Sequence, residues 1–182
     1  MNKPLSLSQS SLQAFVDCPR LFQLKYLENV SWPASQVGPF LAFEQKIQLG
    51  IDFHRLSQQY FSGIDPDLLK SSIQGEEITQ LLERFLLFAD DMVFCKHWSE
   101  FVLAMPFQDQ RLVIKIDLLI KNNQGRFQIY DWKTSHHKPD RSALSNRIQT
   151  ILYPYLFLKA SKNLFPDKII SPSAVEMIYW YG

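Results

Sequence analysis

The sequence is poor in cysteine, with Cys18 and Cys95 as the two among its 182 residues. Two cysteines make no disulfide framework, so we expect a reduced intracellular protein. The first residues, MNKPLSLSQSS, lack the apolar core of a secretory signal peptide, and no apolar run approaches the length of a membrane span. These absences argue against a secreted disulfide scaffold and against a membrane protein. They predict a cytoplasmic location.

An excess of either charge is also missing, because 19 lysines and arginines nearly balance 18 acids and leave a net charge of +1. This balance argues against extensive nonspecific binding to phosphates, although a local basic groove is still compatible with it. What the sequence does contain is apolar material, since 46% of its residues are hydrophobic and 14% are aromatic. The composition and length favour one domain with a sizeable core. We expect residues 1–95 to be mainly helical and residues 96–182 to hold the main sheet and a helix.

Residues 111–133 contain two apolar segments on either side of an Asn-Asn-Gln-Gly turn, which predicts a β-hairpin. Folding the hairpin about position 124 puts Asp117 opposite Asp131, on one face and with Cβ atoms about 5 Å apart. Lys133 returns to that face two residues later. A divalent cation held by both acids is the simplest explanation for two carboxylates that meet on a mainly apolar strand pair.

Each acid also has a simpler interpretation as a member of an ion pair. Asp117 with Lys133, or Asp131 with Lys115, would form an ordinary cross-strand pair worth about 0.2–1 kcal/mol. Such pairs do not explain two opposed acids, because like charges that face each other destabilise a strand pair unless a cation or a proton lies between them. The pattern therefore favours a metal site.

Hydrophobic periodicity predicts helices before and after the hairpin. They are expected over residues 6–28, as two short helices broken at Pro19, and over residues 40–61, 76–92 and 140–159. A strand over residues 98–107 would extend the hairpin into an antiparallel meander. Residues 174–181 would add a final strand, parallel to a meander strand because a helix precedes it. The expected fold class is α/β, with helices around a mixed sheet.

Five short motifs follow one another along these elements. The C-terminal ones are Asp117, Asp131-Trp132-Lys133 and Gln149-x-x-x-Tyr153, the last on a helix. The earlier ones are Gly50-x-x-x-His54 and an opening that combines Ser6-x-Ser8 with Phe15-x-x-Cys18-Pro19-Arg20 and Phe22. Their order resembles the PD-(D/E)XK nuclease superfamily, and more narrowly the RecB-type exonucleases and their CRISPR-associated relatives. The resemblance extends from Ser6 to the last strand.

The resemblance implies a restriction-endonuclease-like core, in which a three-stranded antiparallel meander, a helix and a further strand form a mixed sheet that follows N-terminal helices. It also implies a site for Mg²⁺ or Mn²⁺ held by His54, Asp117, Asp131 and the backbone carbonyl of Trp132. The sheet should separate at Trp132, because a carbonyl inside a strand ladder has no vacancy for a metal. Taken alone, His54 would be interpreted as a half-buried, hydrogen-bonded helix residue.

By the same resemblance, Asp117, Asp131 and Lys133 would be the catalytic residues. Lys133 would position the attacking water or stabilise the charge on the phosphate. Gln149 and Tyr153 would line the groove and hold the scissile strand, although the tyrosine suits a core position equally well. A metal ion suits this chemistry because it activates water and neutralises charge that develops on the phosphate.

The leading hypothesis is a metal-dependent DNA nuclease, a RecB-like exonuclease of DNA repair, recombination or defence. Its partners would be single- or double-stranded DNA and, in some settings, a helicase or another repair or defence subunit. A catalytically inactive nucleic-acid-binding or scaffold domain of the same fold is the alternative. An RNA-directed or tRNA-processing nuclease would use the same site on another substrate.

The related group often carries an iron–sulfur cluster held by one cysteine near the start and three near the end. Cys18 stands at the first of these positions, but no cysteine follows Cys95. We therefore expect no iron–sulfur cluster in this chain, either because this member lacks one or because the other ligands lie beyond Gly182. Cys18 is then expected to be a buried thiol.

Overall fold

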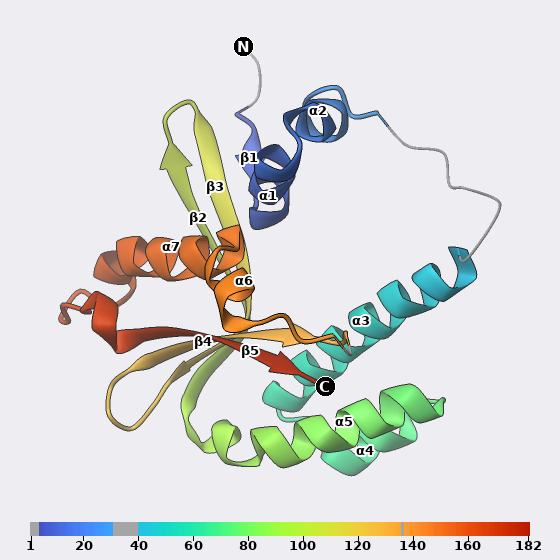
Figure 1. Ribbon diagram of the computed structural model, residues 1–182. Helices are drawn as coiled ribbons and strands as arrows, with labels where there is room; N and C mark the ends of the chain where they lie inside the picture. Colours follow the sequence, from blue (N-terminus) through green and yellow to red (C-terminus); the bar gives the residue numbers. More distant parts are fainter. Residues whose placement is uncertain (1–3, 31–39, 136) are drawn as a thin grey trace. The chain divides into compact units, whose positions relative to one another are not determined.

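A computed structural model describes residues 4–30, 40–135 and 137–182 of the chain, and Figure 1 shows its ribbon. The chain divides into two compact units. Unit 1 comprises Met1–Ser35, Val102–Lys115 and Pro139–Pro172, and unit 2 comprises Gln36–Phe101, Ile116–Lys138 and Ser173–Gly182. Two strands, β2 (Lys96–Phe107) and β3 (Gln110–Lys121), contribute residues to both units. None of the helices in the described ranges has the length and hydropathy that a membrane span requires.

Unit 2 contains the hairpin that the sequence predicted. The second half of β3 pairs antiparallel with β4 (Phe127–Lys133), from Lys121 opposite Phe127 to Leu118 opposite Tyr130. These pairs are symmetric about position 124, so the predicted register is confirmed. The turn between the two strands sets this register.

The last strand, β5 (Val175–Tyr181), pairs in parallel with the other edge of β4, which confirms the predicted final strand. The strands form a five-stranded mixed sheet in which β1, β3, β4 and β5 are neighbours in that order and β2 pairs with β3. The α/β class expected from the sequence is therefore confirmed.

Two helices of unit 2, α3 (Phe40–Phe61) and α5 (Glu76–Ala89), pack on one face of these strands, and α4 (Pro66–Ser71) packs against both helices. The ring of Phe85 on α5 lies 5.3 Å from the rings of both Phe53 on α3 and Trp132 on β4. Because side chains alternate along a strand, Asp131 and Lys133 are directed away from the face that carries Trp132. The aromatic core thus packs on one face of the strands, and Asp131 and Lys133 project to the opposite face.

The helix bounds of unit 2 agree closely with the sequence prediction. α3 has the expected range, whereas α5 ends at Ala89 and the chain continues as the 3₁₀ helix η2 (Asp90–Phe94). A short 3₁₀ helix, η3 (Pro172–Ala174), leads into β5. α3 and the beginning of β2 belong to the same unit as the paired part of the hairpin.

Unit 1 contains the N-terminal elements and the helices that follow the hairpin. The former are β1 (Ser6–Leu7), α1 (Gln9–Asp17), α2 (Pro19–Phe22) and the π-helical turn η1 (Gln23–Leu27). The sequence did not predict β1, which pairs in parallel with the first half of β3 through Ser6 and Arg111. Ser8 caps α1 by accepting a hydrogen bond from the amide of Ser11, as expected for a serine before an apolar periodic run.

The helix predicted over residues 140–159 begins where expected, with Asp140 as its N-cap, but it is interrupted and ends later than Lys159. The chain forms α6 (Arg141–Ser145), breaks, and continues as α7 (Ile148–Leu164). The break lies at Arg147, whose ψ of 140° is extended and incompatible with a continuous helix. Pro154 lies inside α7 without ending it.

Cys18 is exposed, so the expectation of a buried thiol is wrong. It occupies the junction between α1 and α2, where extended backbone angles of −159° and 101° end the first helix and Pro19 begins the second. A junction residue outside both helical faces is not packed into either helix interface. Cys95 is half-buried, and both thiols are unbridged.

Candidate active site

Asp117 lies where β3 and β4 separate. The last pair of the ladder is Leu118 with Tyr130. Asp117 directly precedes Leu118 on β3, and its Oδ2 accepts a hydrogen bond from the backbone amide of Trp132 at 2.8 Å. A side-chain carboxylate therefore occupies a place that a strand carbonyl would otherwise take, and the strands part at the position where separation was expected.

The backbone of Trp132 faces this opening. The carbonyl of Lys133 accepts a hydrogen bond from the amide of Gly182 at 3.2 Å, on the β5 edge of β4. Backbone groups of successive strand residues alternate between the two edges, so the carbonyl of Trp132 lies on the β3 edge with the Asp117 carboxylate. Its use as a metal ligand stays a prediction.

His54 approaches Asp117 from α3. Its Nδ1 lies 3.3 Å from Oδ1 of Asp117, and the two side chains are 35% and 10% exposed. Burial lowers the pKa of His54, but the hydrogen bond and charge of Asp117, together with the charges of Asp131 and Glu100, outweigh burial and raise this pKa above its ordinary value of 6.5. Three carboxylates therefore act on one imidazole.

Glu100 is the site residue that sequence reasoning missed. One ligand atom from each of His54, Glu100 and Asp117 lies within 4.8 Å of the others, which makes a cluster that can hold a metal ion. Glu100 lies within β2 but has a φ of +52°, in the left-handed region that residues other than glycine rarely adopt. Such local distortion re-aims a strand side chain and gathers at functional sites.

The chemistry of this donor set fits a small divalent cation. Around an octahedral ion with bonds of about 2.1 Å, neighbouring ligand atoms lie about 3 Å apart and opposite ones about 4.2 Å apart. Separations of up to 4.8 Å therefore need a modest inward movement. Carboxylate oxygens suit Mg²⁺, and the imidazole nitrogen of His54 moves the preference toward Mn²⁺.

Asp131 pairs with Lys133, which is neither of the two cross-strand pairs considered from the sequence. Oδ2 of Asp131 lies 2.6 Å from Nζ of Lys133, and the side chains are 7% and 28% exposed. The two residues are next neighbours on one face of β4. Asp131 does not belong to the cluster of His54, Glu100 and Asp117, although its charge reaches the imidazole. Its predicted role as a metal ligand stays a prediction.

Gln149 and Tyr153 lie one turn apart on α7, in unit 1, whereas the other predicted site residues lie in unit 2. Both are buried, with 4% and 5% of their surface exposed. Burial of the tyrosine agrees with its alternative interpretation as a core residue. Binding of a nucleic-acid strand by these two residues stays a prediction.

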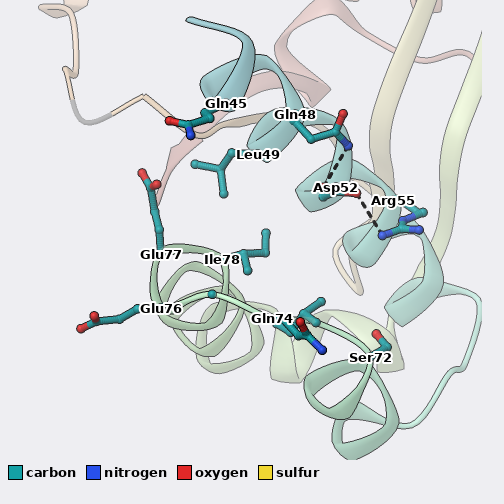
Figure 2. Close-up of a pocket in the computed structure, with 12 residues that line it drawn as sticks. Gln45, Gln48, Leu49, Asp52, Arg55, Ser72, Gln74, Glu76, Glu77 and Ile78 are labelled. Carbon is teal, nitrogen blue, oxygen red and sulfur yellow. Dashed lines mark hydrogen bonds and ion pairs between the residues drawn. The ribbon is translucent and has the colours of Figure 1, made fainter. Parts of the chain in front are cut away.

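A cavity of about 720 Å³ in unit 2 lies between α3 and the start of α5 (Figure 2). In its wall, Asp52 accepts hydrogen bonds from Gln48 and from Arg55, both at 3.0 Å. Glu76 and Glu77 add two further acids. The lining thus carries more negative than positive charge, which disfavours a phosphate backbone.

A smaller cavity in unit 2, of about 320 Å³, lies beside the loop that follows Lys133. It is lined by Lys46, Leu49, Glu77, Thr134, Ser135 and His137. A Cβ atom on Gly50 would lie 3.6 Å from Oγ1 of Thr134, so α3 passes close to this loop. Hydroxyl and ammonium donors make this cavity the better place for a phosphate.

Comparison with protein-family models identifies one that matches residues 6–182, the model of the PD-(D/E)XK nuclease superfamily. The match spans both units and contains every site residue named above. The mixed sheet flanked by helices agrees with the restriction-endonuclease-like fold of that superfamily. No curated protein matches the chain.

Proposed function

Because the chain belongs to the PD-(D/E)XK nuclease superfamily, we propose that it is a metal-dependent nuclease that hydrolyses phosphodiester bonds in DNA. The observation that carries the proposal is the meeting of one imidazole and two carboxylates beside the opening between β3 and β4. When bound, Mg²⁺ or Mn²⁺ would supply activated water and neutralise charge on the phosphate.

The cation would be held by His54, Glu100 and Asp117, which converge from three different elements. Asp131 and the carbonyl of Trp132 would complete the ligand set from the neighbouring strand. Glu100 adds a ligand to the set that the family resemblance implied. Support for this assignment comes from the raised pKa of His54, because it reports the combined negative charge that also attracts a cation.

Lys133 would act on the reacting phosphate. Its ammonium has a defined place, since Asp131 holds it at 2.6 Å and 28% of the side chain is exposed. From this place it can donate hydrogen bonds to a phosphate oxygen and stabilise the negative charge that grows during hydrolysis. Asp131 would keep the ammonium beside the cluster rather than in solvent.

The finer proposal is a RecB-like exonuclease of DNA repair, recombination or defence that works in the cytoplasm, alone or with a helicase or another subunit. With a net charge of +1, the chain would hold DNA through local contacts rather than an extended basic surface. The cavity after Lys133 supplies such contacts through Lys46 and Thr134. Gln149 and Tyr153 would add contacts to the scissile strand.

The proposal is tested by incubating the protein with single-stranded DNA, double-stranded DNA and RNA in Mn²⁺, Mg²⁺ or EDTA. We expect cleavage of DNA in metal, none in EDTA, and none with Asp117→Ala or Lys133→Ala. Asp67→Ala is a matched control, because this α4 acid is 92% exposed and should not affect cleavage. Binding of nucleic acid without cleavage in either metal would instead support the inactive binding domain.

A further inference from the structure

Tyr179 on β5 lies on the face of the sheet that carries Asp131 and Lys133. In the parallel pairing of β4 with β5, Tyr179 is the partner of Asp131, and paired residues of neighbouring strands project to the same face. Their chain neighbours Trp132 and Trp180 project to the opposite face, where both rings pack against Phe85. Tyr179 is therefore an aromatic residue of the candidate active site rather than of the aromatic core.

The ring of Tyr179 faces the ammonium of Lys133. Nζ of Lys133 lies 5.8 Å from the ring centroid and 2.6 Å from Oδ2 of Asp131. An ammonium within about 6 Å of an aromatic face is attracted by the negative potential of that face, more strongly where water is partly excluded. With 28% of the lysine and 7% of the aspartate side chain exposed, this condition is met.

We propose that Tyr179 is a positioning residue for Lys133, and this inference rests on the proposed nuclease function. A lysine side chain has four rotatable carbon–carbon bonds and loses much conformational freedom when it is fixed. A carboxylate alone attracts the ammonium without fixing its direction, since several rotamers reach the same oxygen. The ring, held by β5, adds a second contact from the neighbouring strand and leaves one orientation of the ammonium favoured.

The proposed contact is that of the ammonium with the ring. Tyr179→Phe should therefore retain the wild-type rate in single-turnover cleavage of DNA with Mn²⁺, whereas Tyr179→Leu should lower it by about 3- to 30-fold. The KM should stay unchanged in both, because Tyr179 acts through Lys133 and not on the nucleic acid. A loss in Tyr179→Phe equal to that in Tyr179→Leu, or a raised KM, would overturn the inference.

A ring that merely fills space would pass the same comparison, so the electrostatic contact needs its own test. We would replace Tyr179 with phenylalanines that carry one, two or three ring fluorines, which weaken the negative face with little change in shape. The rate should fall stepwise along this series. The same series at Phe88 is the matched control, since that ring contacts Tyr130 and Trp180 on the opposite face. A flat series at position 179 would contradict the inference.

The contact has a readout that does not depend on cleavage. The ε-methylene protons of Lys133, assigned by their absence from Lys133→Met, should show an upfield ring-current shift in NMR spectra. This shift should persist in Tyr179→Phe and vanish in Tyr179→Leu, and its absence from the wild type would refute the contact. A wild type that shows the shift but cleaves nothing would leave the contact standing and refute the nuclease proposal.

Discussion

One oxygen of the Asp117 carboxylate accepts a hydrogen bond from the backbone amide of Trp132 at 2.8 Å, and the other lies 3.3 Å from Nδ1 of His54. The same acid thus ends the β3–β4 ladder and anchors the candidate metal cluster. Its structural and chemical contributions are separable by substitution, because the amide of Trp132 needs an oxygen and the cluster needs a charge.

Asp117→Asn keeps an oxygen that can accept a hydrogen bond from the Trp132 amide, but it removes the negative charge. We expect its free energy of unfolding to stay within about 1 kcal/mol of the wild type, whereas Asp117→Ala leaves the amide without its acceptor and costs about 1–3 kcal/mol. Both variants should lose cleavage by at least about 100-fold. Urea unfolding and a DNA cleavage assay measure the two effects, and an active Asp117→Asn would contradict the assignment.

The raised pKa of His54 predicts how the metal-free protein responds to pH. A histidine whose pKa is higher in the folded state stabilises the fold below its unfolded value, near 6.5, and this contribution disappears as pH rises through the folded value. In EDTA, the stability advantage of the wild type over Asp117→Asn should therefore be larger in mild acid than above neutrality. Unfolding midpoints across this range measure it, and an advantage that grows with pH would show the opposite sign.

The hairpin and its acids were readable from the sequence because short-range rules determine them. The turn residues set the fold-back point and with it the register, so Leu118 lies opposite Tyr130 as predicted. The bounds of α3 followed from an apolar stripe with helical spacing. The break at Arg147 did not, since a single extended ψ angle leaves no trace in periodicity.

Glu100 escaped prediction because its role depends on one backbone angle and on contacts between distant segments. The sequence shows it as an acid within a strand, without a spacing that links it to His54 or Asp117. Its φ of +52° turns the strand locally, and the three ligand atoms meet only when α3, β2 and β3 are in place. Tertiary convergence of this kind is not encoded in any local pattern.

Substitution of Glu100 should separate stability from metal binding. Glycine adopts the left-handed region without a Cβ clash, so Glu100→Gly should fold at least as stably as the wild type. The loss of one carboxylate ligand should weaken Mn²⁺ binding by at least about tenfold, in this variant and in Glu100→Gln. Calorimetric titration with Mn²⁺ measures the affinity. Unchanged affinity in both variants would remove Glu100 from the site.

His97 ties the end of α3 to the segment that leads into β2. Its Nδ1 lies 2.9 Å from the carbonyl oxygen of Cys95, and its Nε2 lies 3.0 Å from that of Phe61. His97→Phe preserves the contact with the Phe61 ring but leaves these carbonyls without the imidazole, which should cost about 1–3 kcal/mol. Urea unfolding measures the cost.

The matched control for His97 is Leu87→Gln, because Leu87 is 84% exposed and its replacement should change stability by no more than about 0.5 kcal/mol. Since α3 carries His54 and β2 carries Glu100, His97→Phe should also weaken Mn²⁺ binding. Wild-type stability and affinity in His97→Phe would show that this histidine does not hold the two elements together.

The central claim is that this cluster, with Lys133, cleaves DNA. The most direct measurement compares the wild type with Lys133→Met on single-stranded and double-stranded DNA, after calorimetry has established that both proteins bind Mn²⁺. We predict that the wild type cleaves in Mn²⁺ and not in EDTA, and that Lys133→Met binds the metal but does not cleave. A wild type that binds Mn²⁺ and leaves both DNAs intact, or equal cleavage by the two proteins, would contradict the account.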